Sequence, residues 1–164
     1  MTDNNIIKLN KEDILRLEIA TSDGKKTGNY LEFDLEDIEL PLKYQELLER
    51  DEKNKKNLRN QLLIIEKRQD VKGKKLLSKN QEDEIKALND FFKKEKEIYD
   101  LFLGKGGFDK LLNGRNMTWT VFEEIDELIV KQILPHLDLS MTRIQDKVKE
   151  KYSQAVARNK EVLK

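Results

Sequence analysis

The sequence contains no cysteine and only one histidine, His136. The first absence excludes disulfides, a thiolate nucleophile and a cysteine-ligated zinc site within this chain, and the second excludes any site that needs two imidazole groups. The chain also lacks an excess of either charge, because 32 Lys and Arg residues balance 32 Asp and Glu residues in a length of 164. Proteins that bind nucleic acid or anionic lipid through their whole surface usually carry a basic excess, so this balance argues against both kinds of partner.

Long hydrophobic runs are also missing. The longest aliphatic run covers residues 62–65, whereas a membrane-spanning helix needs about 20 apolar residues. Near the N-terminus only Ile6 and Ile7 are adjacent apolar residues, whereas a secretory signal has an apolar stretch of about 7–15 residues. We therefore expect no membrane segment and no signal peptide, and a soluble protein that stays in the compartment where it is made.

An alternating pattern predicts a β-hairpin near the start of the chain. Leu15, Leu17 and Ile19 alternate with charged side chains, which is typical of a half-buried strand over residues 13–20. A second alternating segment covers residues 29–34, and turn-forming residues separate the two segments. Since an isolated hairpin is only marginally stable, its apolar face must either cover the helical core or belong to an edge used for self-assembly.

The first predicted helix follows the hairpin and covers residues 41–71. It begins with Pro41, whose missing N–H group costs nothing in a first helical turn. In its middle, four acidic residues each precede a basic residue by four positions, and almost no apolar residue lies among them. Such pairs stabilise a helix without any core contact, so residues 51–57 should form helix that leaves the core or a solvated connection between two helices.

Capping signals mark the next helix. Ser78 and Gln81 match the capping box that starts a helix. The apolar residues that follow recur at helical spacing, and the glycines within residues 104–107 predict the end of the helix. A short helix over residues 108–112 should come next.

The most hydrophobic helix should start at Thr118 or Thr120 and should end or kink at Pro135. A final helix should then begin at Asp138 or Ser140. Its apolar residues should face inward, and they are Met141, Ile144, Val148 and Tyr152.

Together these elements predict a mainly α protein with an N-terminal β-hairpin followed by a bundle of about four to five helices. We expect a single domain over residues 1–164. The hairpin should occupy residues 13–34, the helical bundle residues 35–152 and a frayed C-terminal tail residues 153–164.

Residues that could carry catalysis are sparse. The glycines of 104–107 follow a helix rather than a strand, and Phe108 stands where a phosphate-binding loop has Ser or Thr. The acidic residues between 123 and 127 lack the Glu-x-x-His unit of helical metal sites, and His136 suits a helix end or the surface. We therefore predict no catalytic, cofactor-binding or metal site, and a protein that is not an enzyme.

Aromatic residues are the candidates for a partner-binding surface, because they are enriched at the centres of protein interfaces. The adjacent rings of Phe91 and Phe92 cannot both face fully inward, so one of them should be available to a partner. Trp119 and Phe122 could belong either to the core or to an exposed contact surface. The candidate partner-binding residues are Phe91, Phe92, Tyr99, Phe102, Trp119 and Phe122.

Two segments of the sequence resemble a known protein family. Residues 30–38 read YLEFDLEDI and lead from the hairpin into the first helix, and residues 121–136 read VFEEIDELIVKQILPH after a glycine-bounded segment. This arrangement resembles the tail assembly chaperones of long-tailed phages and prophages of Gram-positive bacteria. The likeness covers residues 30–38 and 98–152.

The resemblance implies a non-enzymatic protein that binds the long, aggregation-prone tape measure protein in the host bacterial cytoplasm. It also implies that the protein helps to recruit tail-tube subunits and is absent from the mature virion. A tape measure protein is largely helical and exposes apolar stripes before assembly, so a helical partner could shield it by helix-in-groove packing.

Two other kinds of function remain open. One is a helical adaptor or regulator that forms homodimers through the helix at 41–71, or self-associates through the hairpin edge. The other is a helical nucleic-acid-binding protein that uses the basic residues of 53–59 and 72–75, whose binding would weaken steeply with salt.

Overall fold

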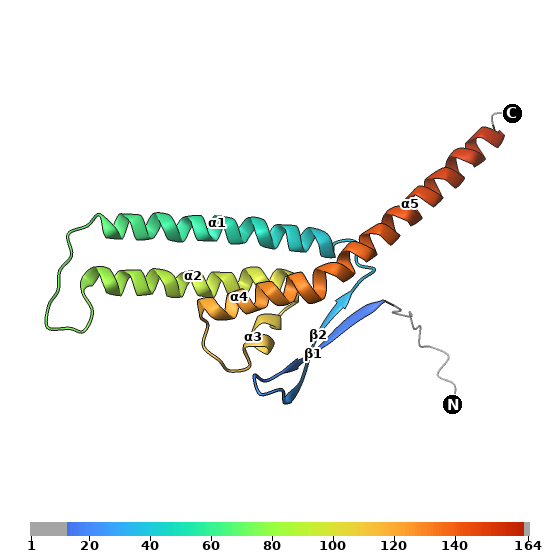
Figure 1. Ribbon diagram of the computed structural model, residues 1–164. Coiled ribbons are helices and arrows are strands. Elements are labelled where there is room, and N and C mark those ends of the chain that lie inside the picture. Colours follow the sequence, from blue (N-terminus) through green and yellow to red (C-terminus); the bar gives the residue numbers. More distant parts are fainter. Residues whose placement is uncertain (1–12, 163–164) are drawn as a thin grey trace, which may run out of the picture.

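The computed structural model describes residues 13–162. The prediction that the N-terminus carries no signal peptide concerns residues outside this range. Two strands precede a series of helices, and the mainly α fold with an N-terminal hairpin is confirmed (Figure 1). The elements are β1 (Ile14–Ala20), β2 (Lys26–Asp34), α1 (Leu40–Glu66), α2 (Lys79–Leu103), α3 (Gly107–Leu112), α4 (Trp119–Leu128), the π-helical turn η1 (Ile129–Ile133) and α5 (Leu134–Val162).

The two strands form an antiparallel hairpin whose apolar face packs on the helices. Leu17 lies opposite Leu31 and Leu15 opposite Phe33 across the hairpin. Leu31 and Phe33 are buried, and the Phe33 ring lies 5.4 Å from the ring of Phe102 on α2. The hairpin therefore covers part of the helical core, which is one of the two roles that the sequence left open.

The helices α1 and α2 lie antiparallel and side by side along most of their length (Figure 1). The structure corrects the prediction that residues 51–57 leave the core, because α1 is continuous and both Asn54 and Leu58 are buried. The Asn54 side chain donates hydrogen bonds to α2, so a polar residue occupies an inward position that the sequence pattern assigned to solvent. The helix ends at Glu66 rather than at Val71.

The signals that begin α2 and α4 are confirmed. Ser78 and Gln81 form a complete capping box at the start of α2, and the Thr118 side chain accepts a hydrogen bond from the Val121 amide at the start of α4. The end of α2 is also as predicted, because Gly104 follows it with a φ of 90°, a conformation that favours glycine.

Of the two outcomes predicted at Pro135, the structure corrects the end of the helix, because helical structure continues beyond it. The helices α4 and α5 join through η1, in which the Leu134 amide bonds to the carbonyl of Ile129, five residues back. This wide turn lies where the proline ring would otherwise crowd the carbonyl of Lys131. The chain is therefore helical from Trp119 to Val162, and no new helix starts at Asp138 or Ser140.

The C-terminal half of α5 projects away from the rest of the molecule (Figure 1). The prediction that Met141, Val148 and Tyr152 face inward is wrong, because all three are exposed. Their spacing is that of an amphipathic helix, but no other described element lies opposite them. The helix α5 ends at Val162, and the fraying of residues 153–164 stays a prediction.

A single buried hydrogen bond anchors α5 to the segment that follows β2. The Ser140 hydroxyl donates to the main-chain carbonyl of Leu35, and Ser140 is 6% exposed.

We expect Ser140→Ala to lower the free energy of unfolding by about 1–3 kcal/mol, because the buried carbonyl loses its donor. Thr142→Ala is the matched control. The Thr142 hydroxyl bonds to its own helix at an exposed position, so its loss should change stability by less than about 0.5 kcal/mol. Urea unfolding of both variants measures the difference, and equal effects would contradict the anchoring role of Ser140.

Candidate partner-binding surface

Most of the six aromatic candidates lie in the core of the monomer. Their rings form a continuous cluster in which Phe92 stacks on Phe122 with ring centres 5.3 Å apart, and Phe122 lies 5.6 Å from Tyr99. Phe102 joins the hairpin side of the core, 5.3 Å from Tyr44. Five of the six side chains are at most 9% exposed. Those five are Phe91, Phe92, Tyr99, Phe102 and Phe122.

The expectation that Phe91 or Phe92 stays free for a partner is wrong. Phe91 is 4% exposed and Phe92 9% exposed, because α2 is covered on more than one side. The backbone at Phe91 meets Asn54 of α1, whereas both rings lie within 5.3 Å of the Trp119 ring at the start of α4. Trp119 is 47% exposed, so it is the one candidate that a partner can reach in this structure.

A polar cluster lies between α1 and α2, and we define it as Asp51, Asn54, Lys55 and Glu95, of which Asn54 and Glu95 are buried. Glu95 is only 1% exposed and accepts a hydrogen bond of 2.8 Å from the Asn54 amide. Lys55 pairs with Asp51 at 2.9 Å. Sequence reasoning missed this cluster, because its members alternate with charged residues that face water.

Burial raises the pKa of Glu95 to about 8, and a hydrogen bond with the neighbouring Asp51 carboxylate adds to the rise. Glu95 is therefore mainly protonated at pH 7, and its hydrogen is shared with Asp51. The Tyr99 hydroxyl donates to Asp126 of α4 next to this cluster, and burial together with that bond raises the pKa of Tyr99. Burial raises the pKa of Asp126 as well.

This arrangement joins α1 to α2. Glu95 is enclosed, and its hydrogen-bonding groups are directed at α1 rather than at an open cavity. The open space beside Asp51 and Asp126 is a small cleft of about 220 Å³ lined mainly by aliphatic and aromatic side chains. Across the described chain, no group of three or more acidic or histidine residues is arranged to hold a metal ion.

The glycine-rich turn between α2 and α3 is occupied by a side chain of the protein itself. The Asp100 carboxylate accepts hydrogen bonds of 2.9 Å from the Phe108 amide and 3.3 Å from the Gly106 amide. A phosphate group in this turn would need the same amides. His136 is exposed on α5, away from the turn and from the polar cluster.

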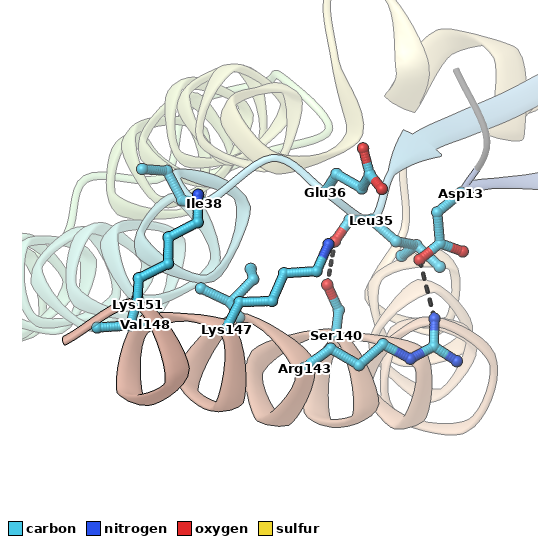
Figure 2. Close-up of a pocket in the computed structure, with 10 residues that line it drawn as sticks. Asp13, Leu35, Glu36, Ile38, Ser140, Arg143, Lys147, Val148 and Lys151 are labelled. Atoms are coloured by element: carbon cyan, nitrogen blue, oxygen red, sulfur yellow. Dashed lines mark hydrogen bonds and ion pairs between the residues drawn. The ribbon is translucent and has the colours of Figure 1, made fainter. Parts of the chain in front are cut away.

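The surface with the clearest shape for a partner is an open groove of about 540 Å³ between α5 and the segment after β2 (Figure 2). Apolar groups from both sides line it, namely Leu35, Ile38, Ile144 and Val148. The basic residues Arg143, Lys147 and Lys151 follow one another at every helical turn along α5. Asp13 and Glu36 are the acidic residues of the lining, and Asp13 pairs with Arg143 at 3.1 Å.

The groove continues into an apolar stripe on α5, which we define as Met141, Ile144, Val148 and Tyr152. These residues lie three or four positions apart, so they share one face of the helix. Val148 is 62% and Tyr152 72% exposed. The sequence predicted this stripe as an apolar face, but assigned it to the core.

Comparisons with protein-family models, with curated proteins and with solved structures find no match to this chain. Within residues 13–162, no helix combines the length and the apolar character needed to cross a membrane.

The protonated state of Glu95 gives the folded protein a pH-dependent stability. The unfolded chain releases this proton near pH 4.5, whereas the folded chain keeps it to about pH 8. The free energy of unfolding should therefore fall as the pH rises from about 4.5 to 8. Glu95→Gln keeps a neutral side chain that can accept from Asn54 and donate to Asp51, so it should flatten this slope and stabilise the protein at pH 8 by up to about 4 kcal/mol.

Urea unfolding at several pH values between 5 and 8 measures the slope. Glu97→Gln is the control, because it removes an exposed carboxylate from the same helix and should leave the slope as it is. If Glu95→Gln has the same slope as the unmodified protein, the buried carboxyl group is not protonated in the folded state.

Proposed function

We propose that this protein is a non-enzymatic tail assembly chaperone that binds the tape measure protein of a long-tailed phage or prophage. The resemblance of residues 30–38 and 98–152 to that family supports the kind of partner. In this role the protein acts in the host bacterial cytoplasm, helps to recruit tail-tube subunits around the tape measure protein, and is absent from the mature virion.

The observation that carries the proposal is the apolar stripe on α5, of which Met141, Val148 and Tyr152 are exposed. An apolar face that no element of the same chain covers is a typical contact surface for a partner. A helix is also rigid before it binds, so little conformational entropy is lost when it packs against a second helix. A largely helical tape measure protein offers such a second helix.

The aromatic cluster has a different part in this proposal from the one that the sequence suggested. Its buried rings hold α4 against α2, and α4 continues directly into α5. The rings therefore support the helix that carries the stripe. The partner contacts the stripe itself, which consists of Met141, Ile144, Val148 and Tyr152. Trp119 remains a second candidate contact because of its exposure.

Homodimerisation through the helix at 41–71 has less support. The apolar face of α1 is turned toward the rest of the monomer, where Leu47, Leu58 and Ile65 are buried. The exposed apolar residues of α1 are Leu42 and Leu48 near one end and Leu63 and Ile64 near the other. Charged residues fill the outer face between them, so α1 keeps no continuous apolar face for a second copy.

The proposal predicts that co-expression keeps the tape measure protein of the same phage or prophage in solution and that the two proteins co-purify. The double variant Val148→Asp/Tyr152→Asp should reduce the amount of co-purified tape measure protein at least about tenfold, because it places charges on the contact stripe. Both positions are exposed, so the variant should fold as the unmodified protein does.

The matched control is Thr142→Asp/Ser153→Asp, which adds the same side chains at exposed positions of the same helix, about 115–135° of helical rotation from the centre of the stripe. This control should leave co-purification unchanged. If the tape measure protein is equally soluble with and without this protein, the proposed function is wrong.

A further inference from the structure

We infer that the groove beside α5 binds an amphipathic helix whose apolar stripe is flanked by acidic residues. The inference rests on the proposed function for the identity of the partner, which would be a segment of the tape measure protein. It goes further by stating the charge pattern that this segment must have, and by naming Lys147 and Lys151 as the residues that select it.

The shape of the groove suits one helix laid along α5. Leu35 and Ile38 lie on one side of the groove and Val148 on the other (Figure 2). Ile144 of α5 also lines the groove. Ile38 is 68% exposed and Val148 62% exposed, so each side presents an apolar group that gains contacts only when the space between them is filled. A row of aliphatic side chains on a partner helix fills such a space in the way that helical ridges pack into grooves.

The charges around the groove are unequal. Arg143 is paired with Asp13, whereas Lys147 and Lys151 make no ion pair within residues 13–162. Figure 2 shows both lysine side chains extending from α5 toward the segment that carries Leu35 and Ile38, while the Glu36 carboxylate points away from α5. Two ammonium groups, one helical turn apart, therefore lie along the groove with no opposing carboxylate between them and an incoming helix.

This charge pattern disfavours a second copy of α5 as the occupant. In an antiparallel pair of α5 helices, the flank that carries Lys147 and Lys151 would face itself and bring like charges together. In a parallel pair it would face the opposite flank of the stripe. That flank carries Gln145, Lys149, Tyr152 and Val156, none of which is acidic. The acidic residues Asp146 and Glu150 lie on the side of the helix away from the stripe.

A partner helix with an acidic flank would both fill the apolar groove and pair with the two lysines. Glutamates spaced one helical turn apart on the partner would meet Lys147 and Lys151, while its aliphatic residues would pack between Ile38 and Val148. Exposed ion pairs contribute little affinity but strongly disfavour partners of the wrong charge. The apolar contact would therefore provide most of the binding, and the two lysines would determine which helix is accepted.

The experiment compares two fluorescently labelled helical peptides of about 20 residues. Both carry the same leucine stripe, and glutamates flank the stripe in one peptide and lysines in the other. Fluorescence anisotropy with the full-length protein should show the glutamate peptide binding at least about tenfold more tightly at low salt, with the preference shrinking at high salt. The variant Lys147→Glu/Lys151→Glu should reverse the preference.

Lys149→Glu is the matched control, because two residues correspond to about 200° of rotation and place Lys149 on the side of α5 opposite both selecting lysines. It should leave the preference unchanged. Equal binding of the two peptides, or an equal effect of the control, would overturn the inference. A dimer in light scattering that dissociates when the glutamate peptide is added would support the groove as a helix site, but would overturn its selection against a second copy.

The inference and the proposed function can fail separately. If neither peptide binds but the tape measure protein still co-purifies, the groove inference is wrong and the proposed function stands. If the glutamate peptide binds as expected but the tape measure protein does not co-purify, the groove inference stands and the proposed partner is wrong.

Discussion

The contact between Phe92 of α2 and Phe122 of α4 determines where the rest of the molecule can lie. The two rings stack with their centres 5.3 Å apart, and the Trp119 ring lies edge-on to Phe92. Because α4 passes through η1 into α5 without a break, fixing α4 against α2 also fixes the direction of the long C-terminal helix. After the Ser140 bond to Leu35, α5 runs past the end of the core and leaves its apolar stripe uncovered. A surface suited to a partner thus follows from the packing of the core.

The polar cluster between α1 and α2 adds specificity to a contact that is otherwise apolar. Asn54 can donate to Glu95 and to the Phe91 carbonyl only when the two helices are aligned in one register. A shift of either helix would bury these groups without partners, which costs more than the hydrogen bonds contribute. The unusual protonation of Glu95 is therefore a consequence of packing two helices through carboxyl groups. The raised pKa of Glu95 follows from its burial and from the neighbouring Asp51 carboxylate.

The division between a rigid aromatic core and an exposed apolar stripe suits the proposed chaperone function. A chaperone has to release its client, so the contact needs to be moderate in strength and selective in kind. Aliphatic contact over one helical face gives moderate affinity, and the lysines along the groove add selectivity with little extra strength. Aromatic residues give stronger contacts, and apart from the exposed Tyr152 and Trp119 most of the large rings described above lie in the core.

Local signals in the sequence predicted the hairpin, the starts of α1, α2 and α4 and the end of α2, because a capping box at Ser78, a hydroxyl at Thr118 or a glycine at 104 acts through neighbours a few residues away. It also determined that α5 has an apolar face. It could not determine whether that face is covered, because this depends on an element elsewhere in the chain lying opposite. For the same reason, Asn54 appeared solvated and Phe91 and Phe92 appeared too close to be buried together. Only the tertiary structure decided these points, since burial is a property of two surfaces that meet.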